Sequence, residues 1–122
     1  MAVTLGGSNK LRRITVDWTS DGSGDATDTV TIDGVIVRLI TDPAAGGAAP
    51  DDDYDVTVVD EFGLDLLDGQ GANRDTAVTE HVLLAGGLTT THVYHEGSCT
   101  VTIANAGATN QGQVVLFVAW GK

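Results

Sequence analysis

The sequence is short of cysteine, cations and long apolar runs, and each shortage excludes a class of protein. A single cysteine, Cys99, excludes a disulfide framework within the chain. Six lysines and arginines stand against 17 aspartates and glutamates, and the net charge of -11 argues against nucleic acid as a partner, because such a surface repels phosphate groups. No apolar run reaches the length of a membrane span, and the N-terminus lacks the apolar run of a signal peptide. We therefore expect a soluble protein with no nucleic-acid or membrane partner.

Glycine and β-branched residues are plentiful. Sixteen glycines and only two prolines favour strands and turns over helices. At 122 residues the chain has the length of one domain with a core of its own. We therefore expect a single β-rich domain.

Apolar and polar residues alternate in several short segments, which is the period of a half-buried strand. Ile14, Val16 and Trp18 share one face of the first segment. The segment 113–120, QVVLFVAW, is apolar on both faces, as in a central strand or one covered by a partner. The predicted strands are residues 11–18, 30–40, 54–58, 64–66, 81–84, 89–94, 98–104 and 113–120. About eight strands joined by glycine turns predict an all-β fold, a jelly-roll-like β-sandwich or barrel of antiparallel strands.

Two segments leave the assignment open. Asp33-Gly34 suits either a two-residue turn between two strands or a bulge within one long bent strand. Residues 72–80 suit one helical turn, although Thr76, Val78 and Thr79 favour extended chain.

The first ten residues are small, polar and poor in apolar side chains. We expect them to form an extended N-terminal arm, with residues 11–122 as the β-domain. Lys10, Arg12 and Arg13 lie together, whereas much of the remaining chain is acidic. A basic segment of this kind can dock on an acidic neighbour, including another copy of the chain, so these three residues are the candidate partner-binding residues.

The stretch from Asp51 to Asp75 is predicted to form a β-hairpin followed by a glycine loop. Tyr54, Val56 and Val58 fall on one face of its first strand. Residues 60–63, Asp-Glu-Phe-Gly, suit a type I turn, and the alternation resumes at Leu64 and Leu66. The preceding loop, residues 42–53, is long and contains both prolines, so we treat it as a candidate contact element.

Alternating aspartates suggest calcium but do not match a known loop. Asp51, Asp53 and Asp55 resemble the start of an EF-hand loop, which would then require Gly in place of Val56 and Glu in place of Phe62. A weaker cluster of the same kind is formed by Asp21, Asp25 and Asp28. We predict solvated loops at both places and no metal ion.

Histidine and cysteine spacing argues against zinc in the same way. His92, His95 and Cys99 lie close in sequence, with His81 as a possible fourth ligand. On a strand, however, His92 and His95 point to opposite faces, and Cys99 has no second thiolate beside it. Histidines on a half-exposed sheet are the simpler interpretation.

No catalytic group is assigned from the sequence. Ser98 lacks the glycine-flanked turn of a hydrolase nucleophile, and no glycine-rich phosphate loop precedes a helix. A glycosidase pair of carboxylates stays open, because the separation that defines such a pair is three-dimensional. The aromatic residues are few, and Trp18 and Trp120 lie in core patterns, so only a small sugar platform could form. We expect no enzyme activity and no cofactor.

Several motifs of the central stretch resemble a class of small virion proteins of tailed bacteriophages. They are residues 50–56 (PDDDYDV), 60–67 (DEFGLDLL) and 71–76 (GANRDT), and residues 103–107 (IANAG) before the last apolar strand extend the resemblance. It covers about the last two thirds of the chain, and the same motifs also make sense as turns.

This resemblance implies a β-sandwich or barrel that assembles on the phage particle as a capsid decoration, or cement, protein. It further implies binding to the major capsid protein on the outer capsid surface, self-association, commonly as a trimer, and synthesis in the host cytoplasm. No catalytic residues come with it. A phage tail or fibre component and a carbohydrate-binding β-sandwich are the alternatives.

Overall fold

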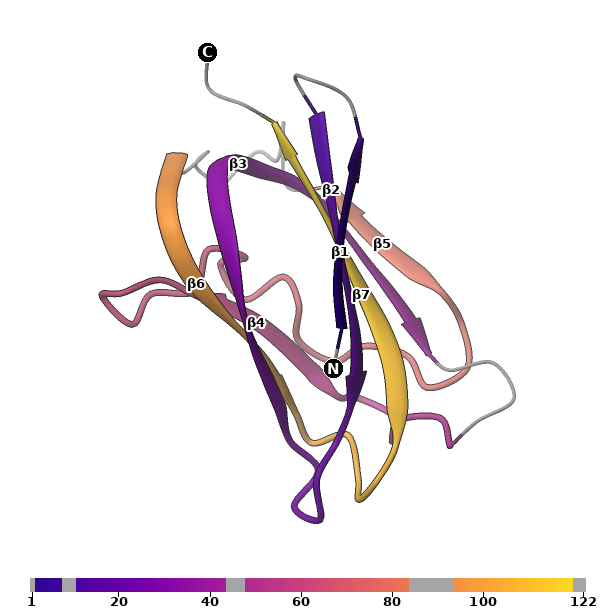
Figure 1. Ribbon diagram of the computed structural model, residues 1–122. Helices are drawn as coiled ribbons and strands as arrows, with labels where there is room; N and C mark the ends of the chain where they lie inside the picture. Colours follow the sequence, from indigo (N-terminus) through magenta and orange to yellow (C-terminus); the bar gives the residue numbers. More distant parts are fainter. Residues whose placement is uncertain (1, 8–10, 44–47, 84–93, 120–122) are drawn as a thin grey trace.

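The computed structural model describes residues 2–7, 11–43, 48–83 and 94–119, which form seven β-strands with their turns (Figure 1). The strands are β1 (Ala2–Gly7), β2 (Leu11–Thr19), β3 (Ala26–Pro43), β4 (Asp55–Val59), β5 (Glu80–Leu83), β6 (Tyr94–Ala104) and β7 (Gln111–Ala119). Those ranges contain no helix, in line with the composition. A helix able to cross a membrane is accordingly not found in them.

All seven strands belong to one antiparallel sheet. Its hydrogen-bonded path runs β1-β2-β7-β3-β6-β4, and β5 pairs with the second half of β3 beside this path. Within the described ranges the end strands β1 and β4 are not paired with each other, so the sheet is not closed. The predicted all-β antiparallel fold is confirmed, and the closed-barrel version of the prediction is not the form that these strands adopt.

Strand β3 settles the ambiguity at Gly34, because it is one long bent strand of 18 residues. Its first half pairs with β6 and its second half, from Val35, pairs with β7. Gly34 lies where the partner changes, at φ 143°, and a Cβ atom there would be 2.0 Å from the carbonyl oxygen of Ala119. A register shift between Ile36 and Arg38 adds an irregularity just beyond it. The bend allows one strand to belong to both parts of the sheet.

The hydrophobic core lies where the sheet curves round on itself. Trp18 of β2 contacts Tyr54 at the entry to β4, with ring centroids 5.7 Å apart, although β2 and β4 lie near opposite ends of the path. The buried set comes from both parts of the sheet and includes Ile14, Val16, Val30, Ile32, Leu39, Val56, Val58, Cys99, Val101, Ile103, Val114, Leu116 and Val118. The alternation predicted for β2, β4 and β6 is therefore confirmed.

The predicted N-terminal arm is wrong for Ala2–Gly7. These residues form β1 and pair antiparallel with Arg12 to Asp17 of β2. The reason lies in the backbone: β2 offers a free row of N–H and C=O groups, and a segment with little apolar content can pair with that row. The remaining part of the predicted arm, which includes Lys10, lies outside the described residues.

The prediction of a second strand in the central hairpin is also wrong. The observed pairing there is a single β-bridge between Val59 and Asp65. Leu64 is 64% exposed, and Leu67 takes the buried position instead. Residues 72–79 form neither helix nor strand, and the chain returns to the sheet at Glu80. Most of the predicted strand 89–94 lies outside the described residues.

Strand β7 occupies the central position that its composition predicts. It lies between β2 and β3 and pairs with both along most of its length. Val114, Leu116 and Val118 point into the core, so Val115 and Phe117 point to the other face of the sheet.

Candidate functional site

Asp60 closes the turn that follows β4. Its N–H donates to the carbonyl of Leu64 (3.0 Å), and its own carbonyl accepts from Gly63 (3.1 Å), which confirms the predicted turn. The Oδ1 atom of Asp60 also accepts from the N–H groups of Phe62 (2.9 Å) and Leu64 (3.0 Å). The turn is thereby held in one shape while Phe62 and Leu64 project outward, 79% and 64% exposed.

The carboxylate of Asp65 accepts backbone hydrogen bonds in the place where the sequence predicts a second hairpin strand. Oδ1 accepts from the N–H groups of Val58 (3.0 Å) and Leu67 (3.0 Å), and Oδ2 accepts from Gly69 (3.0 Å). One side chain thus provides the hydrogen-bond acceptor for an N–H group at the edge of β4 and for two N–H groups of the turn beyond it. This explains why regular pairing ends at a single bridge.

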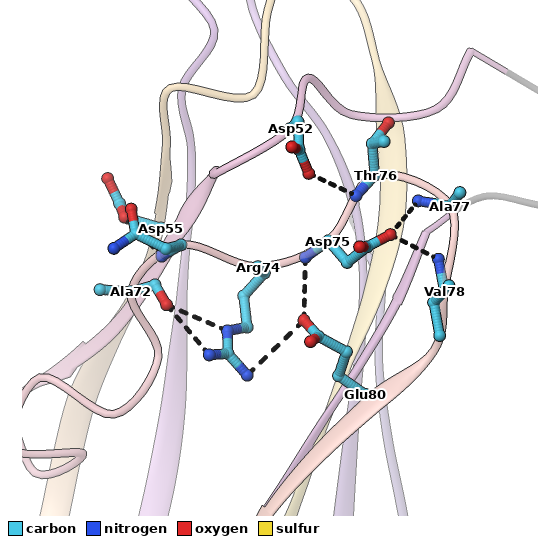
Figure 2. A network of polar contacts seen from close by, with 10 residues as sticks. Asp52, Asp55, Ala72, Arg74, Asp75, Thr76, Ala77, Val78 and Glu80 are labelled. Carbon is cyan, nitrogen blue, oxygen red and sulfur yellow. Dashed lines mark hydrogen bonds and ion pairs between the residues drawn. The ribbon is translucent and has the colours of Figure 1, made fainter.

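Arg74 fastens the following loop to the sheet, as Figure 2 shows. Its backbone N–H donates to Tyr54 (2.7 Å), and its Nε and Nη2 atoms donate to the carbonyl of Ala72 (3.1 and 3.0 Å). Its Nη1 atom lies 3.7 Å from Oε1 of Glu80, and that same oxygen accepts from the N–H of Asp75 (2.8 Å). The guanidinium is therefore used within the fold.

The neighbouring aspartates have similar roles. Asp75 Oδ1 accepts from the N–H groups of Ala77 (2.7 Å) and Val78 (2.8 Å), and Asp52 Oδ1 accepts from Thr76 (3.2 Å) (Figure 2). These bonds fix the loop that leads into β5.

Asp55 links two loops that are distant in sequence. Its Oδ1 atom accepts from the N–H of Asn73 (3.0 Å), and its Oδ2 atom accepts from Nδ2 of Asn105 (2.7 Å). Both asparagines have positive φ angles, 58° and 61°, a conformation that asparagine adopts more readily than most residues. Gly71 completes the arrangement, because a Cβ atom there would lie 2.2 Å from the carbonyl oxygen of Val56. The motif at residues 71–76 is thus explained by local structure.

In the aspartate cluster of residues 21–28, Asp21 holds a turn together in the same manner as these loops. Asp21 accepts from the N–H groups of Asp25 (3.1 Å) and Ser23 (2.8 Å), and these bonds lower the pKa of the Asp21 carboxyl. Asp51, which begins the other cluster, is exposed. Across the ranges that the structure describes, no three His, Cys, Asp or Glu side chains gather to hold a metal ion.

The candidate zinc ligands do not form a described group. Cys99 is buried as a free thiol in β6, and His81 is exposed on β5. Burial, together with the negative charges of Asp60 and Glu61, raises the pKa of Cys99 to about 11. His92 lies outside the described residues.

The three predicted partner-binding residues separate in the structure. Arg12 and Arg13 are successive residues of β2, so their side chains leave opposite faces of the sheet. Arg12 is half-buried and Arg13 is exposed, and Lys10 is not among the described residues. Their role in binding a partner stays a prediction.

A mixed basic and apolar face, which the sequence did not indicate, forms on the outer side of β2, β7 and β3. Phe117 lies between Arg13 and Arg38, which are its cross-strand neighbours on either side. The guanidinium carbon of Arg38 lies 5.4 Å from the centroid of the Phe117 ring. Next along β7, Val115 is paired with Ile40 of β3. We call Arg13, Arg38, Ile40, Val115 and Phe117 the arginine–phenylalanine face.

Sequence comparison leaves the phage resemblance as a hypothesis. Neither the known protein-family models nor the curated proteins give a match to this chain.

Proposed function

We propose that the protein is a structural component of a bacteriophage particle: a capsid decoration protein that self-associates, binds the major capsid protein and stabilises the outer capsid shell. The proposal combines the motif resemblance with the architecture of the described residues. We also propose that the curved sheet forms a two-layered β-sandwich. The contact between Trp18 and Tyr54, on strands near opposite ends of the path, supports this arrangement.

The outer side of β7 is the observation that supports assembly. Val115 and Phe117 point away from the core, on a central strand whose inner side is already buried; Val115 is only 8% exposed within the chain, whereas Phe117 is half-buried and can be covered further by a neighbour. A strand with apolar side chains on both faces is typical of a subunit whose outer face is covered by a neighbouring subunit. Symmetric assembly provides such a neighbour.

The loop from Asp51 to Glu80 supports a structural role in a second way. Asp52, Asp55, Asp65 and Asp75 accept hydrogen bonds from backbone N–H groups of their own chain. Because these carboxylates hold the backbone of the loop in one conformation, the loop offers a preformed surface to a partner.

Binding of empty capsids tests the proposal directly. The protein should co-sediment with capsids of the phage that encodes it, and should raise the temperature at which they open. Lys10→Glu tests the predicted basic docking residue while leaving Arg13 in place, and Asp25→Lys is a control at an exposed loop position. Failure of the wild-type protein to bind capsids would contradict the decoration function, and binding to purified tails instead would support the tail alternative.

A carbohydrate-binding module is the second candidate, supported by the exposed ring of Phe62. Against it, Trp18 is buried in the core and unavailable for stacking on a sugar. A glycan array gives the deciding result: specific binding that Phe62→Ala abolishes would favour this candidate over the decoration protein.

A further inference from the structure

The turn after β4 exposes apolar side chains in a rigid and acidic setting. We call residues 60–64 the apolar tip. Phe62 and Leu64 are largely exposed there, and Asp60 fixes the backbone through two N–H groups. Glu61 is exposed and adds negative charge. A preformed apolar projection of this kind loses little conformational entropy when it binds.

The arginine–phenylalanine face has the opposite charge and a similar apolar content. Phe117 and Ile40 are half-buried, and Arg13 beside them is exposed. The Nε atom of Arg38 is buried but makes no hydrogen bond. Arg13 therefore offers an exposed cationic group on this part of the sheet, in a protein of net charge -11.

We propose that the apolar tip of one copy docks on the arginine–phenylalanine face of a second copy. Phe62 and Leu64 would pack against Phe117 and Ile40. The carboxylate of Glu61 would lie beside Arg13. Apolar anchors surrounded by complementary charges are the usual arrangement of a specific interface.

The contact is head-to-tail, because its two halves are different surfaces. In Figure 1 the turn after β4 projects from the left flank, away from β2 and β7. A heterologous contact of this type forms a ring if the rotation closes and an open chain if it does not. The inference deepens the proposed self-association and does not depend on capsid binding.

Two variants with complementary defects test the contact by light scattering. Phe62→Ser damages only the tip, and Arg13→Glu damages only the face, at an exposed side chain. Each should weaken self-association by about tenfold or more. Val78→Ser is the matched control for the tip, because Val78 is 57% exposed but lies outside it, and it should leave the mass unchanged.

Mixing the variants distinguishes this contact from any symmetric one. At a concentration where each is monomeric, the mixture should form a heterodimer and nothing larger, since one intact tip meets one intact face. Combining Arg13→Glu with Glu61→Lys in one chain should restore self-association, which a folding defect would not allow. A monomeric wild-type protein, or a mixture that stays monomeric, would overturn the inference. Capsid binding by such a monomer would leave the decoration function standing, so the two failures are separable.

Discussion

The indole of Trp18 and the phenol ring of Tyr54 meet inside the core at an interplanar angle of 51°. Trp18 belongs to β2, and Tyr54 enters β4 from the loop after β3. Their contact joins two regions that hydrogen-bond pairing keeps far apart in the sheet. Gly112 makes room for it, since a Cβ atom there would lie 2.5 Å from the indole ring.

Stability at high pH should report on Tyr54. Burial, with a contribution from the negative charge of Glu80, raises the pKa of Tyr54 to about 12, although the positive charge of Arg74 acts in the opposite direction. The folded state therefore retains a proton that the unfolded chain, with its ordinary pKa of 10.0, has lost. The free energy of unfolding should be unaffected by this group below about pH 10 and should fall as pH rises from about 10 to 12.

Urea unfolding at several pH values measures this effect. Tyr54→Phe is the comparison, because it keeps the ring and removes the ionisable hydroxyl. The difference between wild type and variant should change in that alkaline range only. Since the Tyr54 hydroxyl is buried and makes no hydrogen bond, the variant should also be at least as stable as wild type at neutral pH. Parallel pH curves for the two proteins would contradict the assignment.

Gly34→Ala should strongly destabilise the fold. The added methyl group would collide with the backbone of Ala119, and φ 143° is strained for any side chain. We expect a loss of about 3 kcal/mol in the free energy of unfolding. Gly22→Ala is the matched control, because its added Cβ would meet nothing within 4 Å, and it should change stability by less than about 0.5 kcal/mol. Equal effects of the two substitutions would show that the bend in β3 does not depend on Gly34.

Asp65→Ala should loosen the segment after β4. It removes the acceptor for the N–H groups of Val58, Leu67 and Gly69, and we expect a loss of about 2 kcal/mol, measured by denaturant unfolding. Asp65→Asn keeps a carbonyl oxygen and should recover part of the loss. Asp25→Ala, which removes an exposed carboxylate, should have little effect, and an equal loss there would point to charge rather than hydrogen bonding.

Cys99 should resist thiol reagents while the protein is folded. Its side chain is 2% exposed, and a pKa of about 11 leaves little thiolate at neutral pH. Reaction with a disulfide reagent should therefore be slow in buffer and rapid in urea. Fast labelling of the native protein would mean that β6 opens easily.

Much of the fold was predictable because its signal is local. The alternation of Ile14, Val16 and Trp18 follows directly from the geometry of a half-buried strand, and so does the two-sided apolar character of β7. The turn at Asp60 was also predictable, since its residues suit the required conformations. The pairing of β1 was not predictable, because backbone hydrogen bonds along a free edge require no particular side chains.

The sequence alone determined an acidic, β-rich chain with a single cysteine, because charge, strand period and turn chemistry are properties of neighbouring residues. Only the tertiary structure decided that β3 serves both parts of the sheet. It also decided that Asp65 replaces a strand and that Phe117 lies between Arg13 and Arg38. The pairings of β3 and the position of Phe117 join residues far apart in sequence and depend on pairing register, because a slip of one residue would turn each side chain to the other face of the sheet. The bonds of Asp65 are local, but they form only because the chain folds back along β4.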